Sequence, residues 1–230
     1  MLVLHALSLA ILLPAASFHH QPSNKPIQSQ PIMQDVFKGD PFPTHWVNPG
    51  YMKIVWIQSP NYGERPEGTV VDTVVVHSTV DPTLESVARY FNTSKSQVSS
   101  HYIIGRDGSI IQCVSTFYRA WHAGRSRDFL GRNDLNNFSV GIELVNLDDG
   151  KDPYPQPQID ALRTLILALE YRFPLKYITS HAYIAIPRGR KIDPAGFPWD
   201  KLTGTGLKIM YKGYAPSEPG DPKPEVPHNG

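Results

Sequence analysis

The chain has a single cysteine, Cys113, among 230 residues. One thiol cannot close an internal disulfide, so cysteine content does not identify the compartment in which the protein works. Cys113 lies in the apolar run from Ile110 to Val114, and nothing nearby in the sequence suggests a nucleophile. We therefore expect Cys113 to be a small buried apolar residue rather than a reactive one.

An excess of one sign of charge is also missing, because 22 Lys and Arg residues are balanced by 21 Asp and Glu residues. No basic block occurs, which excludes the charge pattern of a nucleic-acid-binding protein and predicts no nucleic-acid partner. An apolar run of about 20 residues, the length that spans a bilayer, is absent too, so we expect no stable membrane span. The chain contains no His-Glu-x-x-His sequence, which counts against a zinc peptidase of that type.

Core-forming residues are scarce at both ends of the chain. Residues 18–44 and residues 213–230 each contain five prolines and few aliphatic side chains. Such segments bury too little apolar surface to offset the entropy cost of ordering them. We predict one compact domain over residues 45–212, between a Pro-rich N-terminal segment and a Pro-rich C-terminal tail, and we expect a monomer.

The first 17 residues have the pattern of a secretory signal. Residues 2–13 are almost wholly apolar, and the small-residue sequence Pro14-Ala15-Ala16-Ser17 follows them. We predict a signal peptide over residues 1–17 and export to the periplasm, the cell envelope or the extracellular space. No basic residue precedes Lys25, so the usual positive start is missing. An uncleaved interfacial anchor or a mis-assigned start stays the alternative.

Strand and helix signals alternate through the middle of the chain. Strands are predicted over residues 69–76, 139–146 and 177–180, and a hairpin over residues 101–105 and 109–114. The strand over 69–76 is rich in β-branched residues, so we expect it to be buried on both faces and to end at His77. Asp107-Gly108 is a strong signal for the hairpin turn.

Two helices complete the pattern. The first is predicted to begin with Asp81 as N-cap and Pro82 at its first position, and the second to run from Pro157 to about Arg172. The second helix carries an apolar stripe made of Ile159, Leu162, Leu165, Ile166 and Leu169. The sequence therefore predicts the α/β class, with a single domain and a central mixed β-sheet flanked by α-helices.

Three candidate metal ligands are far apart in the sequence: His77, His181 and Asp193. Each histidine follows a predicted strand, which places it at the rim of the sheet where α/β folds bind ligands. Two imidazoles and one carboxylate leave a tetrahedral zinc ion one open position, the pattern of a catalytic zinc. Taken alone, each histidine is more often a hydrogen-bonded structural residue than a metal ligand, and only their occurrence together with Asp193 favours the metal site.

Two charged residues are candidates for catalysis. Lys191 lies two positions before Asp193, and in an extended stretch this spacing places both side chains on one face. A cation there would stabilise a developing oxyanion, and the alternative is a surface ion pair worth under about 1 kcal/mol. Glu143 is a carboxylate within an apolar strand. Desolvation would raise its pKa and suit a general base, and the alternative is a carboxylate capped by backbone amides.

These residues belong to longer motifs that together resemble a known family. The motifs are Ser100–Gly108, Arg119–Gly124, Asn137–Leu144 and His181–Pro194, in addition to the strand that ends at His77. In this order they resemble the zinc-dependent N-acetylmuramoyl-L-alanine amidases, the type-2 amidases, over roughly residues 69–202. That family shares its fold with bacteriophage T7-type lysozyme and the peptidoglycan recognition proteins.

The resemblance implies a role for each residue. His77, His181 and Asp193 would bind Zn²⁺, Glu143 would activate water, and Lys191 would stabilise the transition state. The segment of Trp121, His122 and Ala123, together with Asn137, would border the groove for a peptidoglycan or muropeptide substrate. The family reads Pro-Gly after its third ligand, whereas this chain reads Pro194-Ala195-Gly196, so we expect a different turn there.

The resemblance implies hydrolysis of the amide bond between the lactyl group of N-acetylmuramic acid and L-alanine. A peptidoglycan-binding module of the same fold without catalysis is the alternative. Relatives of that kind lack a zinc ligand, whereas this chain has His77, His181 and Asp193. The sequence leaves open whether intact wall or soluble fragments are cleaved.

Overall fold

The computed structural model describes residues 54–210. The predicted signal peptide (1–17), N-terminal segment (18–44) and tail (213–230) lie outside this range. The strands of the main sheet are β1 (Ile54–Trp56), β3 (Thr73–Ser78), β4 (Tyr102–Ile104), β5 (Ile110–Gln112), β7 (Ser139–Leu144), β8 (Tyr177–Ser180) and β9 (Lys208–Ile209). The other elements are the strands β2 (Tyr62–Gly63) and β6 (Arg119–Ala120), the helices α2 (Leu84–Phe91), α3 (Gln156–Arg172) and α4 (His181–Ile184), and the 3-10 turns η1 (Ser94–Ser96), η2 (Leu135–Asn137) and η3 (Trp199–Leu202).

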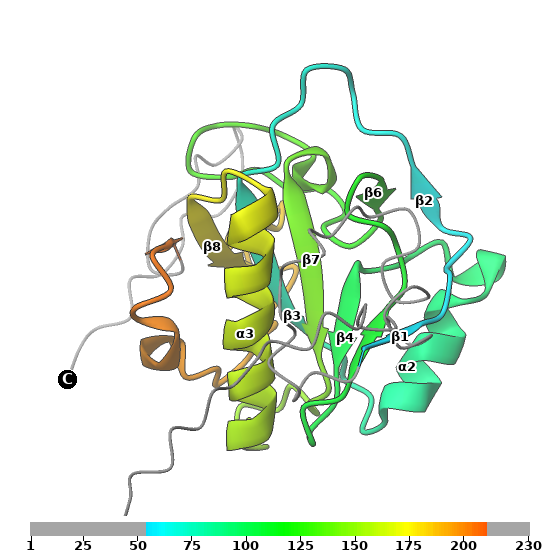
Figure 1. The fold of residues 1–230 in the computed structure, drawn as a ribbon, viewed down its shortest axis with the longest axis vertical. Coiled ribbons are helices and arrows are strands. Elements are labelled where there is room, and N and C mark those ends of the chain that lie inside the picture. Colours follow the sequence, from blue (N-terminus) through cyan, green and yellow to red (C-terminus); the bar gives the residue numbers. More distant parts are fainter. Residues whose placement is uncertain (1–53, 211–230) are drawn as a thin grey trace, which may run out of the picture.

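The main sheet has seven strands in the order β1-β5-β4-β7-β3-β8-β9. Every neighbouring pair is parallel except β4 and β5, which form the antiparallel hairpin that Asp107-Gly108 predicted. The strands β2 and β6 pair separately. The predicted α/β class with a mixed sheet and flanking helices is confirmed (Figure 1).

The two faces of the sheet bury different partners because side chains alternate along each strand. Val74 and Val76 of β3 and Ile142 of β7 belong to the cluster that contains the apolar stripe of α3. The predicted stripe, from Ile159 to Leu169, is at most 2 % exposed. On the opposite face, Val75 packs under the loops that precede β7 and against α4. Positions of the same parity as Val75 therefore face those loops.

The helix α2 covers the opposite face near the other edge of the sheet, against β4 and β5 (Figure 1). Cys113 is fully buried in this cluster, and burial followed by the charge of Glu143 raises the pKa of its thiol to about 12. The expectation of an unreactive buried cysteine is met. No helix within residues 54–210 is long and apolar enough to cross a membrane.

Several predicted boundaries were wrong, and the starts of β3 and α2 are the most informative of them. The first buried strand, β3, begins at Thr73 rather than at residue 69, and it includes His77. The N-cap of α2 is Thr83, whose side chain accepts a hydrogen bond from the Ser86 backbone. The predicted cap, Asp81, instead accepts the backbone N–H of Thr83 at 3.0 Å, a turn that precedes the helix.

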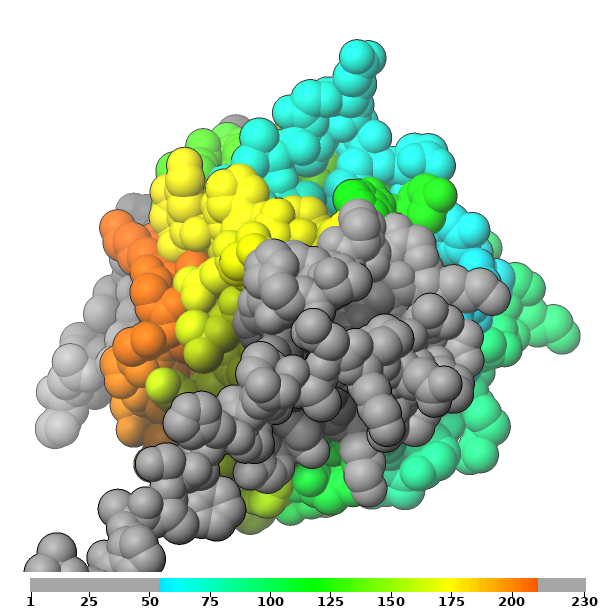
Figure 2. Space-filling model, in the orientation of Figure 1, coloured from blue at the N-terminus to red at the C-terminus, as the bar shows by residue number. Residues whose placement is uncertain are grey.

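The segment between β2 and β3 projects from the top of the molecule in cyan (Figure 2). Its anchor is Arg65, whose guanidinium donates hydrogen bonds to the carbonyl oxygens of Thr116, Asn136, Asn137 and Ser139. Burial and the charge of Arg119 lower the pKa of Arg65 to about 10, so the group stays charged at neutral pH. Arg65 therefore joins the projecting segment to the loop that leads into β7.

We expect Gly108→Ala to destabilise the fold more than Gly68→Ala. Both glycines have positive φ, 85° and 73°, which costs an alanine about 1–2 kcal/mol. A Cβ at Gly108 would also lie 2.8 Å from the carbonyl oxygen of Pro157 in the first turn of α3, whereas nothing lies within 4 Å at Gly68. Urea denaturation of both variants measures the difference. Equal losses of unfolding free energy would show that the contact with Pro157 adds no cost.

Candidate metal centre

The parallel register of β3 and β7 brings the first two predicted site residues together. His77 is the direct partner of Glu143 in this ladder, and both side chains face away from α3. Nδ1 of His77 lies 4.0 Å from Oε1 of Glu143. The two residues lie at the carboxyl ends of adjacent strands, where the sequence predicted a site.

His181 reaches the same position from the other side of β3. The strand β8 pairs with β3 in parallel, with Ser180 opposite Val76. Ser180 then caps the short helix α4 by accepting the backbone N–H of Tyr183, and His181 is the first residue of that helix. The rings of His77 and His181 are 4.6 Å apart between centroids.

Asp193 completes the cluster from a loop. Its Oδ2 lies 3.0 Å from Nδ1 of His181 and 3.2 Å from Nδ1 of His77. The Asp193 carbonyl accepts the backbone N–H of Ala182 at 2.9 Å, which fixes the loop against α4. One ligand atom from each of the three residues lies within 4.8 Å of the others, and all three residues are buried.

The donor set fits a divalent cation. Nε2 of His181 lies 3.2 Å from the carbonyl oxygen of Ala123, which can only accept, so a neutral His181 carries its hydrogen on Nε2. The Nδ1 lone pair of His181 then faces the Asp193 carboxylate, which is unfavourable without a cation between them. Two ligands of a tetrahedral zinc ion are about 3.3 Å apart, given metal–ligand distances of about 2.0 Å. The distances at Asp193 are close to that spacing.

The charges of the cluster are strongly coupled. Burial alone would raise the pKa of Asp193, but the proximity of the His181 and His77 rings outweighs it and holds the pKa well below its usual range. Burial, followed by the charge of His181, lowers the pKa of His77 to about 4. At neutral pH the cluster therefore presents an ionised carboxylate and a neutral His77 imidazole, the protonation states that bind metals.

The environment of Glu143 disfavours the charged form of its carboxyl group. Its side chain is 13 % exposed, and its Oε2 is buried without a hydrogen-bond partner in the described residues. Burial, followed by the charge of Asp193, raises the pKa of Glu143 to about 8, while Lys191 opposes the rise. The carboxyl group is not capped by backbone amides, which was the structural alternative. It is free to exchange a proton near neutral pH.

A cavity of about 840 Å³ joins these groups. Its lining includes His77, Trp121, His122, Glu143, His181, Lys191 and Asp193. Lys191 is exposed, and its charge acts on both His77 and Glu143. The sequence predicted that Lys191 and Asp193 share one face, and both residues line this cavity.

Two residues predicted to border the groove lie elsewhere. The Ala123 side chain is fully buried among Val75 and Leu135, and only its carbonyl oxygen reaches the site, through His181. Asn137 does not line the 840 Å³ cavity, and its side-chain amide lies 3.4 Å from a carboxylate oxygen of Asp134. The preceding residue in the chain, Asn136, supports the site instead.

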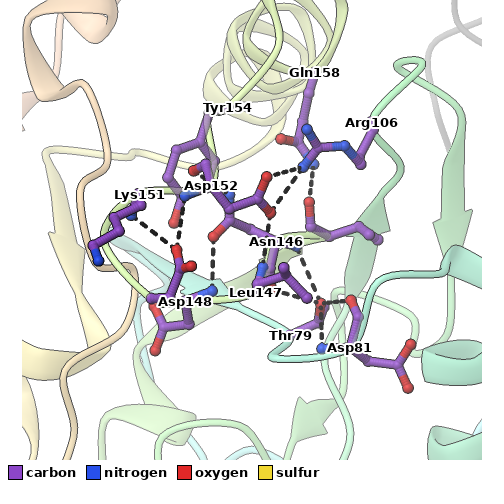
Figure 3. Close-up of polar contacts among 12 residues, drawn as sticks. Thr79, Asp81, Arg106, Asn146, Leu147, Asp148, Lys151, Asp152, Tyr154 and Gln158 are labelled. Carbon is purple, nitrogen blue, oxygen red and sulfur yellow. Dashed lines mark hydrogen bonds and ion pairs between the residues drawn. The ribbon is translucent and has the colours of Figure 1, made fainter.

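Sequence reasoning missed the loop that follows β7, which a polar network holds in place (Figure 3). Arg106 donates to both carboxylate oxygens of Asp152 at 3.0 Å, and the Asn146 side chain donates to the Asp152 carbonyl. This network presents Asp148, whose Oδ1 accepts the Ser78 hydroxyl at 2.5 Å and the Ala195 backbone N–H at 2.7 Å.

Asp148 therefore accounts for the turn after Asp193. Ala195, the residue in excess of the Pro-Gly pattern, is held through its N–H by Asp148 and through its carbonyl by the hydroxyl of Tyr154 at 3.1 Å. The signal in the sequence was the acidic run Asp148-Asp149 directly after a strand. Its partner could not be identified, because it lies 47 positions away.

Comparison with known proteins identifies the family. A family model described as N-acetylmuramoyl-L-alanine amidase matches residues 67–196, more than half of the chain. The chain belongs to this family. The 1,6-anhydro-N-acetylmuramyl-L-alanine amidase AmpD of Citrobacter freundii is 34 % identical over 179 residues, which cover 68 % of this chain and 91 % of that enzyme. The AmpD of Escherichia coli (strain K12) is 33 % identical over 168 residues, 64 % of this chain and 88 % of that enzyme.

Solved structures agree with the amidase family. A crystal structure of a selenomethionine derivative of AmpD superposes with a TM-score of 0.58 at 30 % identity, over 66 % of this chain and 93 % of that one. The amidase AmiD from E. coli, in complex with anhydro-N-acetylmuramic acid-L-Ala-D-γ-Glu-L-Lys, superposes with a TM-score of 0.53 at 30 % identity. That match covers 64 % of this chain and 66 % of AmiD.

We expect Glu143→Gln to change how the stability of the metal-free amidase depends on pH. A carboxyl group with a raised pKa favours the fold while it is protonated and opposes it once ionised. Between pH 4.5 and about 8, the unfolded state loses this proton and the folded state keeps it. The wild type should therefore lose stability relative to Glu143→Gln as pH rises through this window, with no further change above it.

Unfolding free energies of both proteins, measured by urea denaturation across this pH range, check the expectation. The matched control is Glu67→Gln, which removes a carboxylate from the exposed segment between β2 and β3. Parallel curves for wild type and Glu143→Gln would contradict the assigned environment of Glu143.

Proposed function

We propose that this protein is a zinc enzyme that hydrolyses the amide bond between the lactyl group of N-acetylmuramic acid and L-alanine. The observation that carries the proposal is the convergence of His77, His181 and Asp193 beside Glu143 in one cavity of a chain that belongs to the amidase family. The products are a muramic acid with a free lactyl carboxylate and a peptide with a free L-alanine amine.

The metal in this proposal is zinc. His77 and His181 would supply Nδ1 atoms and Asp193 a carboxylate oxygen, a three-ligand set of the catalytic type. When bound, the ion would acidify a water molecule and polarise the scissile carbonyl. The hydrogen bond from His181 to the Ala123 carbonyl orients that ring toward the ion.

Glu143 and Lys191 carry the remaining chemistry. Glu143 faces the ligands from the neighbouring strand, and its raised pKa suits a group that takes a proton from the attacking water and returns it to the leaving amine. Lys191 lines the cavity and supplies a positive charge that would stabilise the oxyanion of the tetrahedral intermediate. Both roles are the ones that resemblance to the family implied.

The substrate class follows from the chemistry that relatives share. AmpD is named for a 1,6-anhydro-N-acetylmuramyl-L-alanine substrate, and AmiD was crystallised with an anhydromuramic peptide. We propose that peptidoglycan or its muropeptide fragments occupy the 840 Å³ cavity, with Trp121 along one wall. The size lies within the range of pockets that bind small molecules. That the enzyme acts as a monomer stays a prediction.

Digestion of purified muropeptides, followed by mass spectrometry, tests the activity. We expect release of peptides that begin with L-alanine, loss of turnover with a chelator and recovery with zinc. Glu143→Gln should retain zinc and lower kcat by about 10²–10⁴-fold, because a general base is lost. His77→Ala should lose zinc as well as activity, and Glu67→Gln should change neither.

Products cut between sugars or within the stem peptide, with the lactyl-amide bond intact, would contradict the assignment. Zinc binding by the wild type without any turnover would favour the non-catalytic binding module.

We also propose that the protein is exported. The apolar run over residues 2–13 and the small residues Pro14 to Ser17 support this, although they lie outside the described structure. Expression of the full chain in a secreting host should give a mature protein that begins at residue 18. N-terminal sequencing measures this directly, and a mature protein that retains Met1 would contradict cleavage.

A further inference from the structure

His122 is buried beside the metal centre, and both of its ring nitrogens contact protein groups. Its Nδ1 lies 3.0 Å from Nε2 of His77, and its Nε2 lies 3.2 Å from the hydroxyl of Ser139. That hydroxyl lies 2.5 Å from the carbonyl oxygen of Leu135. The contacts form a continuous relay from a candidate metal ligand into the core.

The Leu135 carbonyl, at the far end of the relay, determines which atom donates in each of its hydrogen bonds. The Leu135 carbonyl can only accept, so the Ser139 hydroxyl donates its hydrogen there. The Ser139 oxygen then accepts from Nε2–H of His122. In a neutral imidazole the other nitrogen is an acceptor, so Nδ1 of His122 accepts a hydrogen bond from Nε2–H of His77.

The surroundings of His122 keep it neutral. The residue is 7 % exposed, and its neighbours are the rings of His77 and His101, so a second proton would face other bases and no carboxylate among its described contacts.

We propose that His122 is a positioning residue that sets the tautomer of His77. With the hydrogen of His77 held on Nε2, its Nδ1 lone pair faces Asp193 and His181, ready for a cation. The opposite tautomer would direct an N–H at the ion and prevent coordination. This inference rests on the proposed metal site and assigns His122 a role other than substrate binding.

Two further residues support this arrangement, one by leaving space and one by accepting hydrogen bonds. Gly141 is the position in β7 beneath the ring, and a Cβ there would lie 2.4 Å from Cγ of His122. Oδ1 of Asn136 accepts the backbone N–H groups of His122 and Ala123 at 3.0 and 2.8 Å. The Ala123 carbonyl accepts from His181, and Nδ1 of His122 accepts from His77. The Asn136 side chain therefore fixes the two residues that accept hydrogen bonds from the candidate imidazole ligands.

The decisive experiment reads the tautomer in the metal-free, full-length protein by long-range nitrogen–proton NMR. We expect His77 to carry its hydrogen on Nε2 in the wild type. His122→Leu removes the acceptor and should shift the tautomer population, whereas His122→Asn offers an amide oxygen near the position of Nδ1 and should restore it. Zinc affinity, measured by competition with a chromophoric chelator, should fall about 10–100-fold in His122→Leu and recover in part in His122→Asn.

Ser139→Ala and Ser59→Ala form a matched pair. Both serines are fully buried, and each hydroxyl donates to a backbone carbonyl at 2.5 Å, Leu135 for Ser139 and Phe91 for Ser59. Ser139→Ala should shift the tautomer and weaken zinc binding, and Ser59→Ala should leave both unchanged. Equal effects of the two variants would show that the loss of any buried hydroxyl has this effect, and would contradict the relay.

A wild-type His77 that carries its hydrogen on Nδ1 would overturn the proposal, even if no variant folds. Zinc affinity of folded His122→Leu equal to that of the wild type would overturn it as well. A wild type that binds no zinc while its His77 shows the Nε2–H form would refute the proposed function and leave the relay intact, so the two failures are distinguishable.

Discussion

The parallel pairing of β3 with both of its neighbours is the constraint on which the site depends. Because β7 and β8 run in the same direction as β3, three carboxyl ends meet at one edge of the sheet. That edge presents His77 and Glu143 in register and delivers His181 one residue beyond β8. A slip of one residue in either ladder would turn a side chain to the face covered by α3 and separate the groups. The apolar burial of β3 on both faces therefore fixes the chemistry as well as the fold.

Hydrogen bonds explain why polar side chains are tolerated at this buried edge of the sheet. The His181 ring donates to the Ala123 carbonyl, and Asn136 accepts two backbone N–H groups of the same loop. A buried polar group that has its partners costs little, whereas one without them costs roughly 1–3 kcal/mol. Glu143 is different, because its Oε2 has no such partner in the described residues. This unsatisfied oxygen belongs to the residue that we propose to be the general base.

Much of the fold was readable from the sequence because the signals were local. Alternation, β-branched runs and the Asp107-Gly108 turn predicted the strands and the hairpin, and the apolar stripe predicted α3. The start of α2 was misjudged because Asp81 and Thr83 both suit a cap, and it is the Thr83 side chain that accepts the Ser86 backbone N–H. The chemical types of His77, His181, Asp193 and Glu143 singled them out in the sequence, and the structure brings these four residues together. The roles of Asp148 and Asn136 depend on partners distant in the chain, Ala195 and the loop at His122, which no local pattern specifies.

Gly141 shows how a weak signal becomes informative once the fold is known. Glycine in the middle of an apolar strand weakens the strand, so its presence in β7 indicates close approach of another group. The group is the ring of His122, which occupies the space where a Cβ would be and so reaches His77. The parity that places Gly141 beneath His122 also places Glu143 two residues on, facing the ligands. One strand thus supplies the candidate general base near its end. Because Gly141 has no side chain, the same strand also leaves space for the histidine behind the first candidate ligand. This explains why the strand places its glycine and its carboxylate on the same face.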